Sequence, residues 1–376
     1  MQGIEDEINR IVKIAKPIKD KAQELRNLLE RGFFEYPILS KIPSNYPDKL
    51  CIVAIDTGFI EPPAELTGGR LAVIIRAHAF FGCTPSCIEK QEASAMVKFI
   101  ESENNIAKPL SKIVERKFII ELLKRKKNGE LHLDMVLLDG ELIPRIPWWY
   151  SPKAKVRNKY LKKLYNTIID LSNEMFRLAH ETSTALVGIV KRSYGHLIGP
   201  LVGIPDLPLN DKAIATYILK PGEYIDLGYC FDILEKTESM LNELKENKVL
   251  RRILRHRTEW LRKVIEYVWW SGHTKIILYK AWQPTYFSLA TKVEIWPSDL
   301  LLIEHIVGFL AANTGVNGVP YQIDVVDSMC RIPKTLLFET QQEMFRNLAE
   351  RLNDPQLAMS IAGLTNPEKM SRIGFK

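Results

Sequence analysis

Residues 51–58 read CIVAIDTG and residues 135–140 read MVLLDG, and these two stretches decide the fold class. Each is a short apolar run that ends in an aspartate, Asp56 or Asp139, with a glycine one or two positions later. Such runs are typical of strands that are buried on both faces, as in parallel sheets covered by helices. We therefore expect two central strands of an α/β protein. The alternative is that Asp-Gly only marks a turn.

The remaining apolar pattern alternates between strands and helices. Further strands are expected at 71–81, 185–190, 276–282, 286–296 and 321–326, and helices at 111–127, 153–180, 232–270, 300–312 and 334–352. Strands that alternate with helices predict an α/β fold in which helices flank a central sheet.

The N-terminal segment carries its own apolar stripe. Its members recur at steps of three and four: Ile4, Ile8, Ile11, Ala15, Ile18, Ala22, Leu25 and Leu29. This spacing predicts a helix, which Pro17 should kink or split. We expect residues 1–46 to form a helical arm that packs on its own domain or on a second subunit. Residues 47–376 are expected to form one domain with basic helical insertions at 151–182 and 228–270.

Positive charge is concentrated in two places. The chain has a net charge of +7, yet residues 151–169 and 248–263 each carry +6, so the remainder is net negative by 5. Segregated positive charge indicates a polyanionic partner such as DNA. Two solvated helix faces are the alternative.

Several classes of protein are excluded or not expected. No run of 18 apolar residues exists, so no membrane span is expected, and the start MQGIEDE does not resemble a signal peptide. A cytoplasmic location is expected. Cys83 and Cys87 have no second ligand pair nearby in the sequence, so a zinc site is not expected. The chain contains no P-loop, HExxH or GxSxG motif.

Asp56 and Asp139 form a candidate metal site. The carboxyl ends of neighbouring parallel strands lie at the same edge of a sheet, where ligands collect. Two buried carboxylates repel each other unless a cation lies between them, and oxygen-only ligands favour Mg²⁺ or Mn²⁺. Glu121, on the preceding helix, is the candidate third ligand, and Glu115 is its rival. His305 is either a core histidine or a phosphate and proton contact at this site.

The order of these motifs resembles the NurA nuclease family over roughly residues 50–350. The resemblance rests on Asp56-x-Gly, a helix with Glu121, Leu-Leu-Asp139-Gly, Gly188-Ile-Val-Lys191, and Val293-Glu-Ile-Trp296-Pro followed by His305. It implies an RNase H-like central mixed sheet and a metal site formed by Asp56, Glu121 and Asp139. It also implies a catalytic role for His305, and we expect Lys191, Arg192 and Trp296 to contact nucleic acid.

The same resemblance implies a Mn²⁺-dependent deoxyribonuclease, with Mg²⁺ as a second ion. Such enzymes of archaea and bacteria act as single-strand endonucleases and 5′-to-3′ exonucleases in DNA end resection, double-strand-break repair and homologous recombination. Homodimers and a HerA-type hexameric ATPase partner are implied as well. The missing P-loop agrees with an external motor.

The chain departs from the family pattern at two positions. Thr57 stands where glycine is usual after the first aspartate, and Trp296 stands where tyrosine is expected. These departures leave a second hypothesis open, a catalytically silent DNA-clamping subunit or divergent paralogue that binds a motor ATPase. A third is another RNase H-like nuclease such as a resolvase.

Overall fold

The structure is a computed structural model that describes most of the 376 residues. The described ranges are 2–31, 37–47, 49–59, 64–82, 91–100, 106–147, 149–151, 159–192, 195–204, 207, 209–243, 248–282, 288–331 and 334–364. Cys83, Cys87 and the first basic residues of the 151–169 window (Lys153, Lys155 and Arg157) lie outside these ranges.

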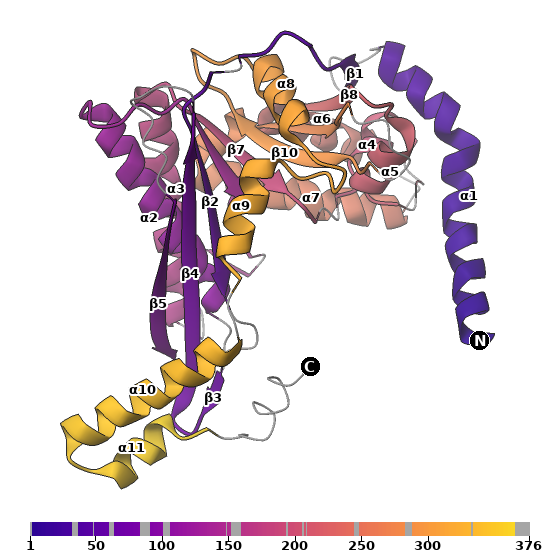
Figure 1. Ribbon diagram of the computed structural model, residues 1–376. Coiled ribbons are helices and arrows are strands. Elements are labelled where there is room, and N and C mark those ends of the chain that lie inside the picture. Colours follow the sequence, from indigo (N-terminus) through magenta and orange to yellow (C-terminus); the bar gives the residue numbers. More distant parts are fainter. Residues whose placement is uncertain are drawn as a thin grey trace.

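A mixed sheet of ten strands forms the centre of the described part of the chain (Figure 1). The strands are β1 (Ile38–Lys41), β2 (Ile52–Phe59), β3 (Ala64–Leu66), β4 (Gly69–Phe81), β5 (Gln91–Ile100), β6 (Met135–Asp139), β7 (Ala185–Val190), β8 (Glu223–Tyr229), β9 (Lys275–Lys280) and β10 (Thr291–Trp296). Their order is β1-β8-β9-β10-β7-β6-β2-β4-β3, and β5 pairs with β4. The prediction of a central mixed sheet flanked by helices is confirmed.

Helices occupy both faces of the sheet. They are α1 (Gln2–Arg31), α2 (Ala107–Lys127), α3 (Lys159–Glu181), α4 (Ile198–Leu201), α5 (Asp211–Ile218), α6 (Cys230–Glu243), α7 (Lys248–Tyr267), α8 (Ile303–Asn313), α9 (Tyr321–Met329), α10 (Lys334–Leu352) and α11 (Pro355–Ala362), with a 3-10 turn at Trp269–His273. No helix in the described ranges is long and apolar enough to cross a membrane.

The two stretches that open the sequence argument are neighbouring parallel strands. β2 pairs with β6 from Ile52↔Met135 to Ile55↔Leu138, and β6 pairs in parallel with β7. Alternate residues point to opposite faces, as the pleat requires. Val53 and Ile55 join the core under α2, α3 and α7, whereas Ile52 and Ala54 join the core under α8 and α9.

Residues 321–326 are helical, so the strand expected there is wrong. Ile323, Val326 and Cys330 are buried at steps of three and four, which is the spacing of one helix face. Pro320, whose ring is compatible with a helix start, immediately precedes α9. The run of β-branched residues resembles a strand locally, but packing against β2, β4 and β6 selects the helix.

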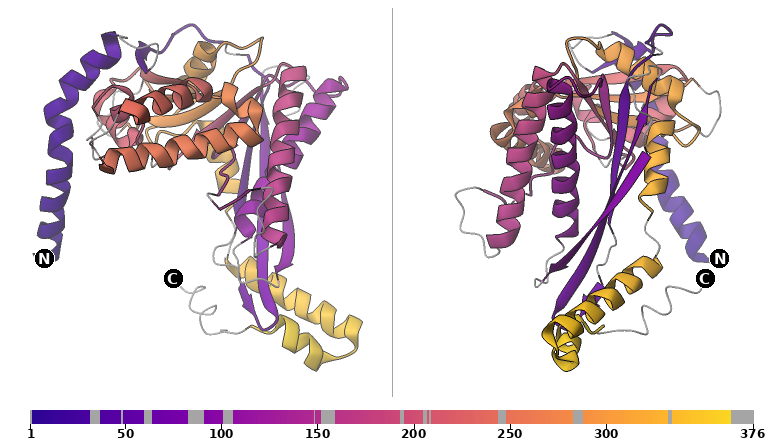
Figure 2. Two further views of the ribbon diagram at one scale, coloured as in Figure 1. Left: turned by 180° about the vertical axis from the view of Figure 1, so that it is seen from behind. Right: turned by 60° about the vertical axis from the view of Figure 1, so that its left-hand side comes forward.

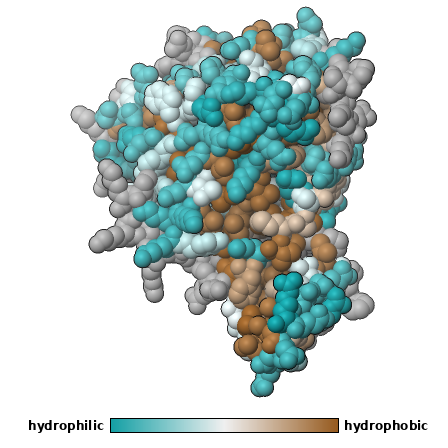
Figure 3. Space-filling view, turned by 90° about the vertical axis from the view of Figure 1, so that its left-hand side faces the viewer, coloured by the Kyte–Doolittle hydropathy of each residue, from teal (hydrophilic) through white to brown (hydrophobic). Residues whose placement is uncertain are grey.

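The pair β4–β5 extends beyond the body and carries α10 and α11 at its far end (Figure 2). The turn between β3 and β4 is tied to the end of α11, because the Thr67 amide donates to the Gly363 carbonyl at 2.7 Å. Figure 3 shows a band of apolar surface between the polar body and this far end. Residues of β5 such as Val97, 46% exposed, lie on this extension.

The helix α1 is buried over only its second half. Ile18, Leu25 and Leu29 are buried, and Arg26 donates to both carboxylate oxygens of Glu223 on β8. The first half, toward the N-terminus, projects beyond the body (Figures 1 and 2). α1 continues through Pro17, so the proline does not split it.

We predict that Gly188→Ala destabilises the protein by about 1–3 kcal/mol, because a Cβ on this residue overpacks the core. That atom would lie 2.6 Å from the Leu142 amide nitrogen and 2.7 Å from the Gly140 carbonyl oxygen, both backbone atoms. Denaturant unfolding measures the change. Gly315→Ala is the matched control, since its Cβ would meet only the Asn317 side-chain oxygen within 3.5 Å. Equal stability of the two variants would contradict this packing argument.

Candidate metal centre

Three carboxylates meet where β6 ends, beside the middle of β2. One oxygen from each of Asp56, Asp139 and Asp327 lies within 4.8 Å of the others. All three residues are buried or half-buried. Oxygen atoms at this spacing fit a hard divalent cation, which binds carboxylates at about 2.0–2.6 Å.

The register of the strands places Asp56 beside Asp139. Ile55 pairs with Leu138, so each aspartate occupies the next position along its strand. Both follow the alternation of Ala54 and Leu137 and therefore point to the face covered by α9. The expectation that parallel strands bring these two carboxylates together agrees with this geometry.

Asp327 reaches the cluster because α9 lies close to β2. Gly58 permits this approach, since a Cβ at that position would lie 2.6 Å from the Cys330 carbonyl oxygen at the end of α9. The glycine of the Asp56-Thr57-Gly58 motif thus makes room for the helix. Ile323, one helical turn before Asp327, is buried in the same core and anchors that face.

The three charges disturb each other. Burial and the Asp139 carboxylate, with smaller contributions from Glu115 and Asp327, raise the pKa of Asp56 to about 7. Burial also raises the pKa of Asp139, although a hydrogen bond from Lys191 opposes this. A carboxyl group whose pKa is raised by like charges favours a bound cation, because the cation removes the repulsion.

Lys191 supplies the nearest positive charge. Its Nζ donates to Asp139 Oδ2 at 2.7 Å and lies 3.4 Å from Asp327 Oδ2. Burial lowers the pKa of Lys191. The hydrogen bond to Asp139 and the negative charges of Asp139 and Asp327 together outweigh this effect, so the pKa of Lys191 is raised. Lys191, expected to contact nucleic acid, directly follows β7, and its amino group faces the acidic cluster.

Glu115 lies behind the cluster on α2. It is fully buried and ion-paired, with Lys112 Nζ 2.7 Å from Oε2 and Arg116 Nη1 3.0 Å from Oε1. Thr57 also donates to it at 3.4 Å. Its charge reaches Asp56, as the pKa of that residue shows. Glu121, the preferred third ligand from the sequence, is exposed and lies outside the metal-capable group among the described residues.

Trp296 and His305 lie toward the opposite edge of the sheet. Trp296 pairs with Leu186 near the start of β7, five positions before Lys191, and is 5% exposed. Its ring packs on Phe176 and Trp270, and its indole donates to the Trp270 carbonyl. This burial does not suit the expected contact with nucleic acid, so Trp296 acts as a core residue.

His305 is in the first turn of α8, and the structure does not bring it to the acidic cluster. Gly308, one turn later, packs against Pro43 and Tyr46, the segment that leads into the start of β2. Asp56 is the fifth of the eight residues of that strand, four positions beyond its start. The expected phosphate contact of His305 therefore finds no support in its position, and its half-buried ring fits the core alternative.

A basic cavity opens beside the centre on the other face of the sheet. Its volume is about 510 Å³, and its charged lining is formed by Lys108, Lys112, Arg116, Glu141, Arg145, Arg192, Asp211, Arg257, Lys292 and Glu294. Three ion pairs involve this lining. Arg145 pairs with Glu141 and Lys292 with Glu294, and Arg116 pairs with the buried Glu115. The excess of basic groups suits a phosphate-bearing ligand.

Sequence reasoning missed Asp327. A strand over residues 321–326 places Asp327 just beyond its end, where nothing in the pattern assigns it a role. A helical reading would have detected it, since Asp327 follows Ile323 by four positions and therefore shares its buried face.

We predict that Asp56→Asn stabilises the metal-free protein at pH 8 but not at pH 5. In the folded protein the pKa of Asp56 is raised to about 7, so the stability of the wild type falls as pH rises from about 4 to 7. The neutral amide avoids that cost. Thermal unfolding in chelator measures the difference. A wild type that is more stable than the variant at pH 8 would contradict the repulsion.

The chain is similar to known proteins of one family. A NurA domain family model matches residues 51–332. The NurA nuclease from Sulfolobus solfataricus superposes with a TM-score of 0.52 at 12% identity, covering 92% of this chain and 98% of that chain. A second NurA crystal structure gives 0.50 at 11% identity, covering 93% and 99%. A NurA structure with manganese gives 0.48 at 12% identity, covering 93% and 99%. None of the curated proteins matches the chain.

The similarity to solved NurA structures extends over nearly the whole chain and agrees with the predicted fold, a central mixed sheet flanked by helices. The family match covers most of the sequence and includes all three carboxylates of the centre, Asp56, Asp139 and Asp327. The chain therefore belongs to the NurA family.

Proposed function

We propose that this protein is a metal-dependent deoxyribonuclease that hydrolyses phosphodiester bonds at Asp56, Asp139 and Asp327. The observation that carries the proposal is the convergence of three carboxylates within 4.8 Å. Only oxygen atoms are offered, which suits Mn²⁺ or Mg²⁺. The NurA resemblance favours Mn²⁺. A bound ion supplies Lewis-acid charge that polarises the phosphodiester and activates water.

Three cationic side chains near the centre are positioned to contact the phosphates of the substrate. Lys191 neutralises Asp139 and Asp327 before the ion binds, and its amino group then becomes free to contact a phosphate oxygen. Lys112 is held near Gly140 and Glu115, at the boundary between the centre and the basic cavity. Arg192 is exposed and lines the same cavity. These cations orient a strand by its phosphates.

A longer basic surface supports DNA as the substrate. α7 exposes Arg251, Arg252, Arg255 and His256, and Arg257 on the same helix lines the cavity. Such a row of cations follows a phosphate backbone and makes binding dependent on salt. We propose that single-stranded DNA is cleaved internally and from its 5′ end, as expected for DNA end resection in double-strand-break repair. The missing P-loop supports a HerA-type ATPase as the motor.

We also propose that the protein works as a homodimer, through the first half of α1. Ile4, Ile8 and Ile11 are 67%, 53% and 53% exposed, although they continue the stripe that is buried at Leu25 and Leu29. Apolar side chains at helical spacing gain free energy when a second helix covers them. A second copy of α1 offers the same stripe, so the contact is self-complementary.

A silent DNA-clamping subunit is the second candidate. The observation that favours it is Lys191, whose amino group already satisfies two of the three carboxylates. If this internal cation takes the place of the metal, the protein binds DNA without cutting it. Salt-dependent DNA binding without cleavage in Mn²⁺ or Mg²⁺ would support the clamping subunit and contradict the deoxyribonuclease.

We predict that Asp327→Asn lowers Mn²⁺-dependent cleavage of single-stranded DNA by roughly two orders of magnitude or more, because one charged ligand is lost. Asp324→Asn is the matched control. It replaces the same side chain by the same amide on the same helix. The Asp324 carboxylate, however, accepts a hydrogen bond from Asn317 at the surface and lies outside the cluster. A gel-based nuclease assay with end-labelled DNA measures the rates. If Asp327→Asn keeps full activity, Asp327 is not a ligand of the catalytic metal.

We predict that Ile8→Glu combined with Ile11→Glu converts the dimer into monomers, because two charges would be buried in the contact between copies. Light scattering coupled to size-exclusion chromatography gives the mass of each species. Val316→Glu is the control. Val316 is similarly exposed, at 53%, but it does not belong to the apolar stripe of α1. A wild type that elutes as a monomer at all concentrations would refute the dimer.

A further inference from the structure

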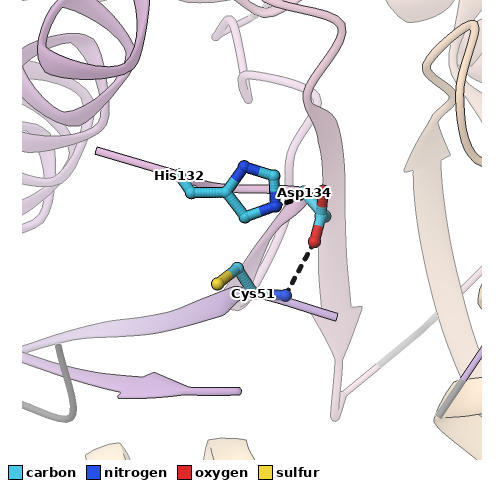
Figure 4. A group of neighbouring side chains, drawn as sticks. All are labelled: Cys51, His132 and Asp134. Carbon is cyan, nitrogen blue, oxygen red and sulfur yellow. Dashed lines mark hydrogen bonds and ion pairs between the residues drawn. The ribbon is translucent and has the colours of Figure 1, made fainter. Parts of the chain in front are cut away.

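A second group of metal-ligating side chains lies at the start of β2 and in the segment before β6. The sulfur of Cys51, an imidazole nitrogen of His132 and a carboxylate oxygen of Asp134 all lie within 4.8 Å of one another. Figure 4 shows the imidazole facing the Asp134 carboxylate, with Cys51 beside them. Among the described residues, only this group and the catalytic cluster have such a geometry.

Hydrogen bonds hold two of the three residues in place. The Cys51 amide donates to Asp134 Oδ2 at 2.7 Å, and the Asp134 amide donates to the Cys51 carbonyl at 2.8 Å. The other carboxylate oxygen of Asp134 lies 3.4 Å from Nε2 of His132. Cys51 is buried, whereas the His132 side chain is 55% exposed. The group is therefore rigid on one side and open to solvent on the other.

The donor set differs in kind from that of the catalytic cluster. Thiolate, imidazole and carboxylate are ligands of Zn²⁺, which binds them at about 2.3, 2.0 and 2.1 Å in a tetrahedron. Two ligands of such an ion lie about 3.3–3.8 Å apart. The observed limit of 4.8 Å exceeds this by about an ångström. A small turn of the exposed His132 side chain supplies that adjustment.

Cys51 is disulfide-bonded in this structure. We propose that Cys51, His132 and Asp134 bind Zn²⁺ when that disulfide is reduced. A phosphine reductant donates two electrons, becomes a phosphine oxide with oxygen from water, and leaves two thiols. Zn²⁺ then displaces the proton of the Cys51 thiol to solvent and forms a Zn–S bond. The oxidised and zinc-bound states exclude each other, since both use the same sulfur.

The position of this site gives it a structural role. Cys51 precedes β2 and Asp134 precedes β6, the two parallel strands whose other ends carry Asp56 and Asp139. Five residues of extended chain separate the sites along β2, or about 16 Å. An ion at Cys51, His132 and Asp134 joins the starts of both strands and stabilises their pairing. The site does not depend on the proposed nuclease activity.

Cobalt provides the test, because Co²⁺ occupies zinc sites and a thiolate ligand adds a charge-transfer absorption that an all-oxygen site cannot produce. We expect the phosphine-reduced wild type, freed of reductant, to show this band at one equivalent of Co²⁺. Zn²⁺ should displace it and raise the melting temperature. The variant with both Asp56→Asn and Asp139→Asn should keep the band. The disulfide form should lack it.

Matched variants assign the ligands. Cys51→Ser should abolish the band, and His132→Ala and Asp134→Asn should weaken Co²⁺ binding roughly tenfold or more. His256→Ala and Cys230→Ala are controls, the first an exposed histidine on α7 and the second a buried free cysteine, and both should retain it. If Cys51→Ser does not fold, His132→Ala, which changes an exposed side chain, decides the question. A reduced wild type without the band, or unchanged affinity in His132→Ala, would overturn the proposal.

Discussion

The mutual repulsion of Asp56, Asp139 and Asp327 is the constraint on which the rest of the structure depends. Parallel pairing of β2 with β6 and the close approach of α9 hold these carboxylates within 4.8 Å in a site of low exposure. Burial first, and repulsion from the Asp139 carboxylate second, raise the pKa of Asp56 to about 7. A fold that retains such an arrangement must supply positive charge, from its own side chains or from a bound cation.

The chain supplies part of that charge itself, and the supply is divided between the two faces of the sheet. Lys191 neutralises the α9 side, where Asp139 and Asp327 lie. Lys112 and Arg116 neutralise Glu115 on the α2 side. The basic cavity continues from Lys112 and Arg116. Positive charge therefore lies on both sides of the acidic centre.

Much of the fold and two of the three carboxylates of the centre could be predicted from local sequence. Two short apolar runs that end in Asp56 and Asp139 were sufficient, because continuous apolar strands are paired in parallel under helices and end at a common edge. Local sequence was enough for these two residues, since each lies on a short buried strand that pairs in parallel with its neighbour.

Helical residues were harder to place, because their contacts depend on how a whole helix packs. Local sequence could not choose between Glu115 and Glu121, and only the orientation of α2 buries Glu115 and exposes Glu121. Residues 321–326 resembled a strand until packing against β2 made them α9, which carries Asp327 to the centre. The sequence by itself therefore determined the central strands β2, β6 and β7, but not β1, β3, β5 and β8, and it determined two carboxylates. Tertiary structure alone decided the third, because that choice follows from contacts between segments about 190–270 residues apart, which no local pattern encodes.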